Sequence, residues 1–587
     1  MLLIVIGIDK GFYSVIRFRQ VPYLEKPGRG RPRAGRMDEV LFRNGAVFDG
    51  TRFLPAGTSV RIRAGRIVEV GPNASPGAAE PVDLGGGTLL PGFIDAHAHP
   101  VFAGYQLRRC DLNAAEHAAD YLEIVAAYAR DHPDEEWITG GGWAMAAFPG
   151  GIPTRHQLDA VVADRPVFLP NRDGHGAWVN SRALMLAGID SHTPDPPDGR
   201  IERDADGVPV GMLQEGAASL VARLLPPVTE EDHYLGLLAA QDYLLSLGIT
   251  GWQDAILGRV MDEADPTNAY LRAAQAGTLR AKVVGALWWD RHRGLDQLPE
   301  LLYRRNAGQA GSFRASSVKM MLDGVAENHT AAMLEPYLDS DGCATGQAGL
   351  DFIDPAELPR FVTALDREGF QVHFHALGDR AVRHALDALE AARRHNGEPG
   401  ARHHLAHLQV VHPQDVPRFA ALGATANIQP LWATHEPQMD DLTIPFLGER
   451  RAGWQYPFRS LLEAGAALCA GSDWPVSSPD PLWGAHVAVN RSLPASVGGH
   501  GGEPFLPAQR LGLAAALAAY TSGSARVNGL ESTVGSIRAG LDADFAVVDA
   551  DLSVLPPQEI CQASVRQTWA AGQIVYEHRG TAAHQQR

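Results

Sequence analysis

Eight apolar segments with the length of buried β-strands alternate with helical segments through the middle of the chain. They span residues 92–99, 249–255, 280–289, 316–324, 371–377, 402–408, 424–430 and 467–473. Before the fifth segment, Leu358, Phe361 and Leu365 recur at helical spacing, and Gly369 marks the end of that helix. Eight strands that alternate with helices are the number that closes a (β/α)8 barrel. The sequence therefore predicts an α/β fold of the TIM-barrel type.

The two ends of the chain have a different pattern from the middle. Residues 38–72 read as short alternating strands, with turn signals at Asn44-Gly45 and Ala64-Gly65. A similar pattern returns between residues 535 and 580. We therefore expect one small β-domain built from residues 37–90 together with residues 525–580, and a barrel domain over residues 91–524.

A large insertion separates the first two expected strands. It holds about 150 residues, which is far beyond the usual length of a loop, so it must contain structure of its own. We place it at about residues 105–230. Loops that follow barrel strands reach the catalytic face, so the insertion is expected to form part of a pocket or a lid.

The first 36 residues differ from the rest in being rich in Arg, Pro and Gly after a very short apolar start. A signal peptide would carry its charge before the apolar run and a small-residue cleavage site after it, and this segment has neither. Residues 1–36 are therefore predicted to be a disordered extension. Met37 opens the first segment with an ordered pattern, and we expect the working protein to begin there.

Composition narrows the range of partners and compartments. The net charge of −17 argues against general binding to nucleic acid or to a membrane surface, because acidic proteins repel phosphates. Four widely spaced cysteines fit a reducing cytoplasm, and no apolar stretch approaches the ~18 residues of a membrane span. The expected partner is a small-molecule substrate in the cytoplasm. A homodimer is one assembly that the sequence leaves open.

Chemistry-bearing residues gather where the expected strands end. The first strand offers His97 and His99, which are two residues apart and so point to the same side. The other candidates are Lys319, His375, His407 and Asp473, from the fourth, fifth, sixth and eighth strands. Side chains at the C-terminal ends of barrel strands converge on one site. Four imidazoles and a carboxylate there predict a site for zinc or a similar divalent metal.

Each candidate residue also has a purely structural interpretation. Most of the 23 histidines must be structural or exposed, and His373 and His403 lie so close to candidates that spacing alone does not exclude them. A lysine at a strand end normally forms a salt bridge, and an aspartate there often caps the next helix. A serine-nucleophile elbow, a P-loop and a distinctive cysteine motif are absent from the sequence. The conjunction of ligand types over five strands favours the metal site.

The chain resembles the amidohydrolase superfamily, and within it the YtcJ-like branch that includes N-substituted formamide deformylases. The matching stretches are LLPGFIDAHAHP, GGGW, RPVFLPNRDGHGAWVNSRAL, GRIERDADGVPVGMLQE, SSVKMMLDG, HFHALGDRAV, LGATANIQP, YPFRSLLEAG, GSDWPV and GSIRAGLDADFAVVD. They run from about residue 37 to about residue 578. The resemblance implies a metal-bearing barrel and a small β-sandwich formed by both termini.

The same resemblance implies roles for the candidate residues. His97, His99, His375 and His407 would be metal ligands, and Asp473 would be a ligand or the general base. Lys319 would be carboxylated and bridge two metals, so that one or two zinc ions are expected.

Trp143 and His175 lie in the insertion, where they would either line the pocket or pack the insertion itself. In the pocket, His175 would hydrogen-bond the substrate carbonyl.

The leading functional hypothesis is hydrolysis of a C–N amide bond in a small molecule, such as an N-acyl or N-formyl amine. A metal ion activates water for such an attack, and a carboxylate moves the proton. The alternatives are opening of a cyclic amide, deamination or ester cleavage on the same scaffold. A non-catalytic regulator that retains the barrel is a further alternative from a different class.

Overall fold

The computed structural model describes residues 39–578, apart from positions 73, 75–78, 114, 116, 173, 198, 260–263, 399, 401 and 494–502. The expected N-terminal extension, residues 1–36, and the expected start at Met37 lie outside the described residues.

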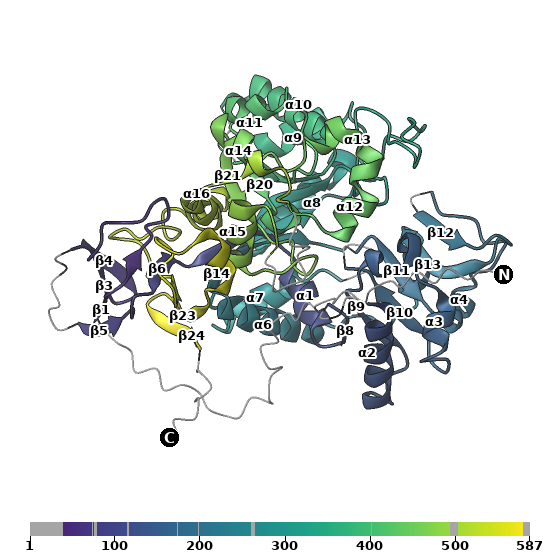
Figure 1. The fold of residues 1–587 in the computed structure, drawn as a ribbon, viewed down its shortest axis with the longest axis horizontal. Coiled ribbons are helices and arrows are strands. Elements are labelled where there is room, and N and C mark those ends of the chain that lie inside the picture. Colours follow the sequence, from purple (N-terminus) through teal and green to yellow (C-terminus); the bar gives the residue numbers. More distant parts are fainter. Residues whose placement is uncertain are drawn as a thin grey trace, which may run out of the picture.

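A parallel sheet of eight strands forms the centre of the molecule (Figure 1). In spatial order its strands are β7 (Phe93–Ala98), β14 (Ile249–Leu257), β15 (Lys282–Trp288), β17 (Phe313–Met321), β18 (Gln371–Ala376), β19 (His404–His407), β20 (Thr425–Ile428) and β21 (Ala467–Ala470). A short strand, β16 (Gln309–Ala310), pairs antiparallel with β17. Each of the eight predicted segments overlaps one of these strands. The prediction of a TIM-type barrel is confirmed.

The residues that follow β21 join the last strand to the first. The backbone N–H of Asp473 donates to the carbonyl oxygen of His97 at 2.7 Å, and the N–H of His99 donates to the carbonyl oxygen of Trp474 at 2.8 Å. The sheet order ends at β7 and β21, so these hydrogen bonds close the ring beyond the regular part of β21. They also bring the two histidines of the first strand next to Asp473.

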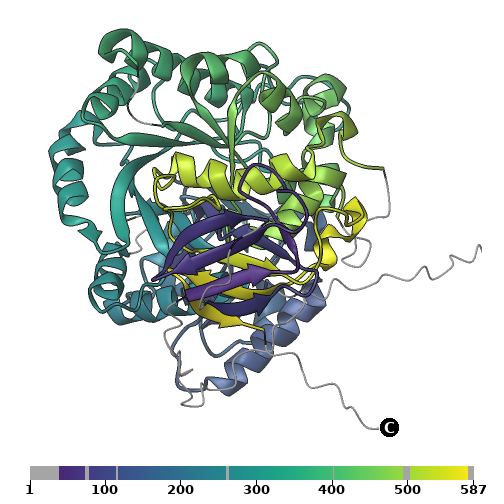
Figure 2. The same ribbon diagram turned by 90° about the vertical axis from the view of Figure 1, so that its left-hand side faces the viewer.

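Helices cover the outside of the barrel (Figure 2). The main ones are α6 (Glu230–Ser246), α7 (Thr267–Gln275), α8 (Leu298–Ala307), α9 (Leu358–Arg367), α10 (Asp379–Asn396), α11 (Val416–Leu422), α14 (Phe458–Glu463) and α15 (Pro481–Asn490). Helix α9 buries Leu358, Phe361 and Leu365 on one face, as their spacing predicts. A capping box between Thr229 and Asp232 begins α6.

Two small sheets from the chain ends lie together at one end of the molecule, purple and yellow in Figure 1. One contains β4 (Arg66–Gly71), β3 (Ser59–Arg63), β1 (Glu39–Arg43) and β5 (Glu80–Asp83). The other contains β2 (Ala46–Val47), β6 (Thr88–Pro91), β22 (Phe545–Val548), β23 (Val565–Ala570) and β24 (Gln573–Glu577). Phe42 meets Phe545 and Trp569 edge to face, so the two sheets share one apolar core. Lys282 of β15 forms an ion pair with the Asp544 carboxylate at 2.6 Å, which links the two small sheets to the barrel.

The segment between β7 and β14 forms a third small sheet, in addition to the barrel sheet, at the opposite end of the molecule (Figure 1). Its strands, in spatial order, are β12 (Gly199–Arg203), β13 (Pro209–Glu215), β11 (Gly176–Val179), β10 (Val167–Pro170), β9 (Ile138–Gly141) and β8 (Cys110–Asp111). Helices α2 (Ala118–Asp131), α3 (Arg155–Asp159) and α4 (Ser181–Ala187) belong to the same segment. Trp143, Phe148 and Trp178 pack against one another in its core.

Between β17 and α9 the chain forms neither helix nor strand over residues 322–357, yet Met333 and Tyr337 in this stretch are fully buried. Among the described residues, every helix is too short or too polar to cross a lipid bilayer.

Candidate metal centre

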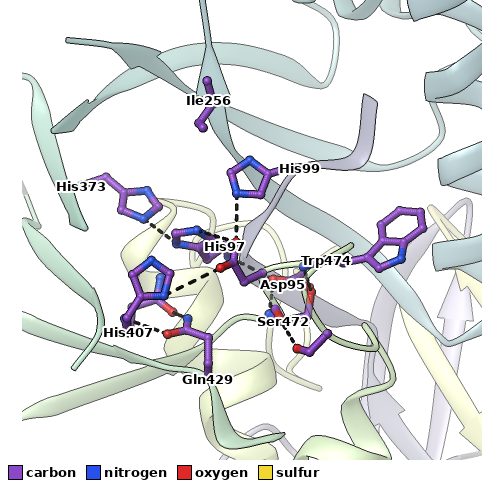
Figure 3. A network of polar contacts seen from close by, with 12 residues as sticks. Asp95, His97, His99, Ile256, His373, His407, Gln429, Ser472 and Trp474 are labelled. Atoms are coloured by element: carbon purple, nitrogen blue, oxygen red, sulfur yellow. Dashed lines mark hydrogen bonds and ion pairs between the residues drawn. The ribbon is translucent and has the colours of Figure 1, made fainter. Parts of the chain in front are cut away.

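Candidate ligands from three strand ends lie next to one another, and Figure 3 shows His97, His99 and His407 among them. His97 lies near the end of β7, and His99 follows that strand directly. His407 is the last residue of β19, and Asp473 lies three residues after β21. Asp473 and His407 have φ angles of +57° and +80°, which non-glycine residues rarely adopt. Such strained backbone is typical of functional sites, where the surrounding fold holds it in place.

Asp473 is the centre of this cluster. Its Oδ1 atom lies 2.9 Å from His99 Nε2 and 3.1 Å from His97 Nε2, and its Oδ2 atom lies 3.9 Å from His407 Nδ1. Burial alone would raise the pKa of the Asp473 carboxyl. The neighbouring imidazoles outweigh burial and hold that pKa well below its usual value, so the group is an anion at neutral pH.

The donor set fits a divalent metal. His97, His407 and Asp473 each offer one ligand atom, and these atoms lie within 4.8 Å of one another; they are the one such group among the described residues. Although His97 Nε2 lies close to Asp473, it lacks a hydrogen bond of good geometry within the described part of the chain, as do both ring nitrogens of His407. Buried nitrogens without partners are costly unless something binds them. Two imidazoles and a carboxylate suit zinc or a similar ion.

The protonation states of the histidines favour the same interpretation. Burial lowers the pKa of His97 to about 3, with the Lys319 charge as a further cause. Burial also moves the pKa of His375 and of His407 well below the usual value. These rings are therefore neutral at pH 7, and the neutral imidazole is the form that binds metal ions.

His375 and Lys319 border the cluster without joining its tightest part. The rings of His375 and His407 have centroids 4.5 Å apart, while His375 Nε2 lies 3.3 Å from the carbonyl oxygen of Gly324. Lys319, on β17, is 2% exposed. Burial lowers the pKa of its amine to about 7, against the opposing effect of Asp473. Much of this amine is therefore uncharged near neutral pH, and an uncharged amine is the form that reacts with CO2.

A further layer of residues orients the ligands. Asp95 Oδ1 accepts the backbone N–H groups of His97 and Ser472, both at 3.0 Å, and so holds the first and last strands together. His373 Nε2 lies 2.8 Å from His97 Nδ1. From its spacing alone, His373 is only a neighbour of the candidate His375. Its spacing of two residues from His375 along β18 is a usable signal, because residues two apart on a strand point to the same side, and the rings contact His97 and His407 respectively.

The two insertion candidates take different positions. Trp143 is fully buried in the core of the insertion, and its indole N–H donates to the carbonyl oxygen of Leu169 at 2.8 Å. The ring has no exposed surface that a substrate could touch, so Trp143 packs the insertion. His175 lies just before β11, and its charge is among the causes that lower the pKa of His375. Its Nδ1 atom pairs with the Glu215 carboxylate, a partner that the sequence did not reveal.

The comparisons with known proteins agree with this geometry. A model of the amidohydrolase family matches residues 80–576. The chain belongs to the amidohydrolase family. This confirms the resemblance found in the sequence.

Several relatives within the amidohydrolase family match over nearly the full length. The putative amidohydrolase YtcJ of Bacillus subtilis is 31% identical over 85% of this chain and 90% of its own. The N-substituted formamide deformylase of Arthrobacter pascens is 30% identical over 89% of this chain and 95% of its own. The crystal structure of an uncharacterized metal-dependent hydrolase from Pyrococcus horikoshii OT3 superposes with a TM-score of 0.67, at 25% identity, over 88% of this chain and 99% of that one. These relatives support metal-dependent hydrolysis as the chemistry of the site.

Proposed function

We propose that the protein hydrolyses a C–N amide bond of a small molecule, an N-acyl or N-formyl amine, by means of a metal-activated water. The observation that carries the proposal is the buried Asp473 carboxylate, within 3.1 Å of a ring nitrogen of both His97 and His99. The full-length similarity to an N-substituted formamide deformylase favours an amide over an ester.

The residues that would hold the metal are His97, His99, His407 and Asp473, with His375 beside them. In this proposal Lys319, when carboxylated, supplies a ligand for a second ion, and the metal is zinc. A bound divalent ion would lower the pKa of water to about 7 and polarise the substrate carbonyl.

Asp473 is the proposed proton carrier. Its carboxylate is ionised, so it can accept a proton from the attacking water as the new C–O bond forms. It then delivers that proton to the leaving nitrogen as the C–N bond breaks. The products are a carboxylate, or formate, and an amine. His175, at the insertion side of the site, would hydrogen-bond the substrate carbonyl oxygen.

We also propose a division of the chain into domains. Residues 37–90 and 525–580 would form one β-sandwich, for which the shared core of Phe42, Phe545 and Trp569 is the support. Residues 91–524 would form the catalytic barrel, with the insertion at about residues 105–230 covering its open end.

Metal analysis and a substrate panel test the function. Protein expressed in zinc-supplemented medium should contain at least one equivalent of metal. It should hydrolyse N-substituted formamides or N-acyl amines faster than matched lactams, aminoheterocycles and esters, with formate or the free amine as the measured product. Protein without metal would refute the metal-dependent mechanism. Protein that holds metal but prefers an ester or a lactam would refute the assigned bond.

A further inference from the structure

A partly buried carboxylate and a partly buried imidazole face each other where the insertion meets the barrel. His175 Nδ1 lies 3.1 Å from both carboxylate oxygens of Glu215. His175 directly precedes β11 and Glu215 is the last residue of β13, and the pairing of Gly176 with Gln214 brings the two residues together. The backbone N–H of Glu215 also donates to the carbonyl oxygen of His175 at 2.8 Å. The side chain of Glu215 therefore holds the imidazole, and the backbone of Glu215 holds the backbone of His175.

Glu215 is fixed in place from the barrel side as well. Asn328, in the stretch after β17, donates from Nδ2 to Glu215 Oε1 at 2.8 Å. Glu215 has a φ of +49°, in the left-handed region that a side chain with a Cβ rarely adopts. A strained backbone that the surroundings hold in place is a common sign of function.

The charge on the Glu215 carboxylate determines which protonation state of the His175 imidazole is favoured. Burial raises the pKa of Glu215, but the charge and hydrogen bond of His175 outweigh burial and lower it. An ionised carboxylate beside an imidazole favours the doubly protonated ring. Among the described residues, the charge of Arg291, from the stretch after β15, also lowers the pKa of Glu215, and His175 interacts electrostatically with His375 of β18.

We infer that Glu215 is a positioning residue that orients the His175 ring and keeps both its nitrogens protonated, so that Nε2–H hydrogen-bonds the carbonyl oxygen of the amide substrate. This inference rests on the proposed amide hydrolysis and adds a second group that acts on the carbonyl. Glu215 takes the Nδ1 edge of the ring, and Nε2 lies on the opposite edge. A charged donor placed before the reaction stabilises the negative charge that develops on that oxygen.

The first test needs no turnover. Diethyl pyrocarbonate acylates the unprotonated imidazole, so the pH dependence of His175 labelling, followed by peptide mass spectrometry, reports its protonation. E215Q keeps the shape and an acceptor oxygen but removes the charge. The midpoint of labelling should move to lower pH by at least one unit. E202Q is the matched control, because Glu202 lies in β12 of the same sheet and pairs with Arg200, so its midpoint should stay at the wild-type value. An unchanged midpoint in E215Q overturns the inference.

The second test is a double-mutant cycle with the best formamide or N-acyl amine from the panel. E215Q and H175A should each lower kcat/KM at least tenfold, and the double variant should be no slower than H175A within twofold. E202Q should keep wild-type kcat/KM. Losses that multiply in the double variant would show that Glu215 acts independently of His175 and overturn the inference.

The two proposals fail in different ways. Wild-type protein that lacks metal, or that is inactive on every amide, defeats the proposed function even when labelling shows the expected shift. A metal-loaded, active wild type with an unshifted midpoint or multiplying losses defeats only the role of Glu215.

Discussion

The contact between His373 and His97 offers a direct test of how the metal centre is built. His373 Nε2 lies 2.8 Å from His97 Nδ1, and both rings are fully buried. A His97 that binds metal through Nε2 carries its proton on Nδ1 and donates it to His373. The variant H373F fills nearly the same space but cannot accept that hydrogen bond.

The expected size of the effect follows from this burial. A buried N–H group left without an acceptor costs about 1–3 kcal/mol. Loss of the residue that orients a ligand histidine typically weakens metal binding by about 10–100-fold. At about 1.4 kcal/mol per tenfold change, this range is about 1.4–2.8 kcal/mol, which agrees with the first figure. We therefore expect the Kd for Zn²⁺ to rise about 10–100-fold in H373F.

The assay is a titration of metal-free protein with Zn²⁺ in competition with a chelator of known affinity. H403F is the matched control, because His403 Nε2 pairs with Asp366 Oδ1 at 3.0 Å and its Nδ1 accepts the backbone N–H of Val372. H403F should lower the free energy of unfolding and leave the Kd for Zn²⁺ within twofold of wild type. A Kd in H373F that also stays within twofold would refute the role of His373.

Four further outcomes are expected. Removal of metal with a chelator should lower the Tm, and Zn²⁺ added back at 100 times its Kd should restore about 2.7 kcal/mol of the free energy of unfolding. A Tm that does not change with metal would contradict the proposed metal site. The variant D473N should keep its circular dichroism spectrum but lose a factor of about 10²–10⁴ in kcat, and near-normal turnover would remove Asp473 as the base. Burial raises the pKa of Asp480 to about 6, so the stability that this carboxyl contributes below about pH 4 is lost as the pH rises through 6. D480N has no charge to bury, and its amide oxygen can still cap α15. In urea unfolding, the free energy of unfolding of D480N relative to wild type should therefore rise between pH 4 and pH 8, by at most about 3 kcal/mol. An equal difference between the two proteins at both pH values would contradict this. W143F loses the hydrogen bond to Leu169 and should unfold more easily by about 1–3 kcal/mol with KM unchanged, whereas a KM raised more than fivefold would return Trp143 to the pocket.

The strand-end residues could be predicted because their signal is local. His97 and Asp473 each end an apolar segment, and barrel topology alone brings such ends together. The eight strands were found for the same reason, since a buried parallel strand appears as a continuous apolar run. Their bounds differ by a few residues. The expected last strand reached residue 473, but β21 ends at Ala470 and the backbone turns to a positive φ at Asp473.

The supporting contacts could not be predicted, because they depend on pairings that the sequence does not encode locally. Glu215 meets His175 only through the register of β11 and β13, 40 residues apart along the chain. His373 lies on β18 and His403 lies just before β19, yet the first contacts His97 and the second contacts Asp366. Trp143 is a residue type that often lines pockets, and only its packing shows that it belongs to the core of the insertion.

The hydrogen bonds that join residues 472–474 to β7 and His99 have a consequence for synthesis of the protein. His97 and His99 leave the ribosome early, but the carboxylate that they contact is made more than 370 residues later. A growing chain can form individual strand–helix units before then, since folding begins at the N-terminus during translation. The ring cannot close before Asp473 and Trp474 emerge, because they supply the backbone groups that bind His97 and His99. The metal centre is thus among the last parts of the barrel to be completed. A chain that ends before residue 471 would lack both the hydrogen bonds that close the ring and the metal site.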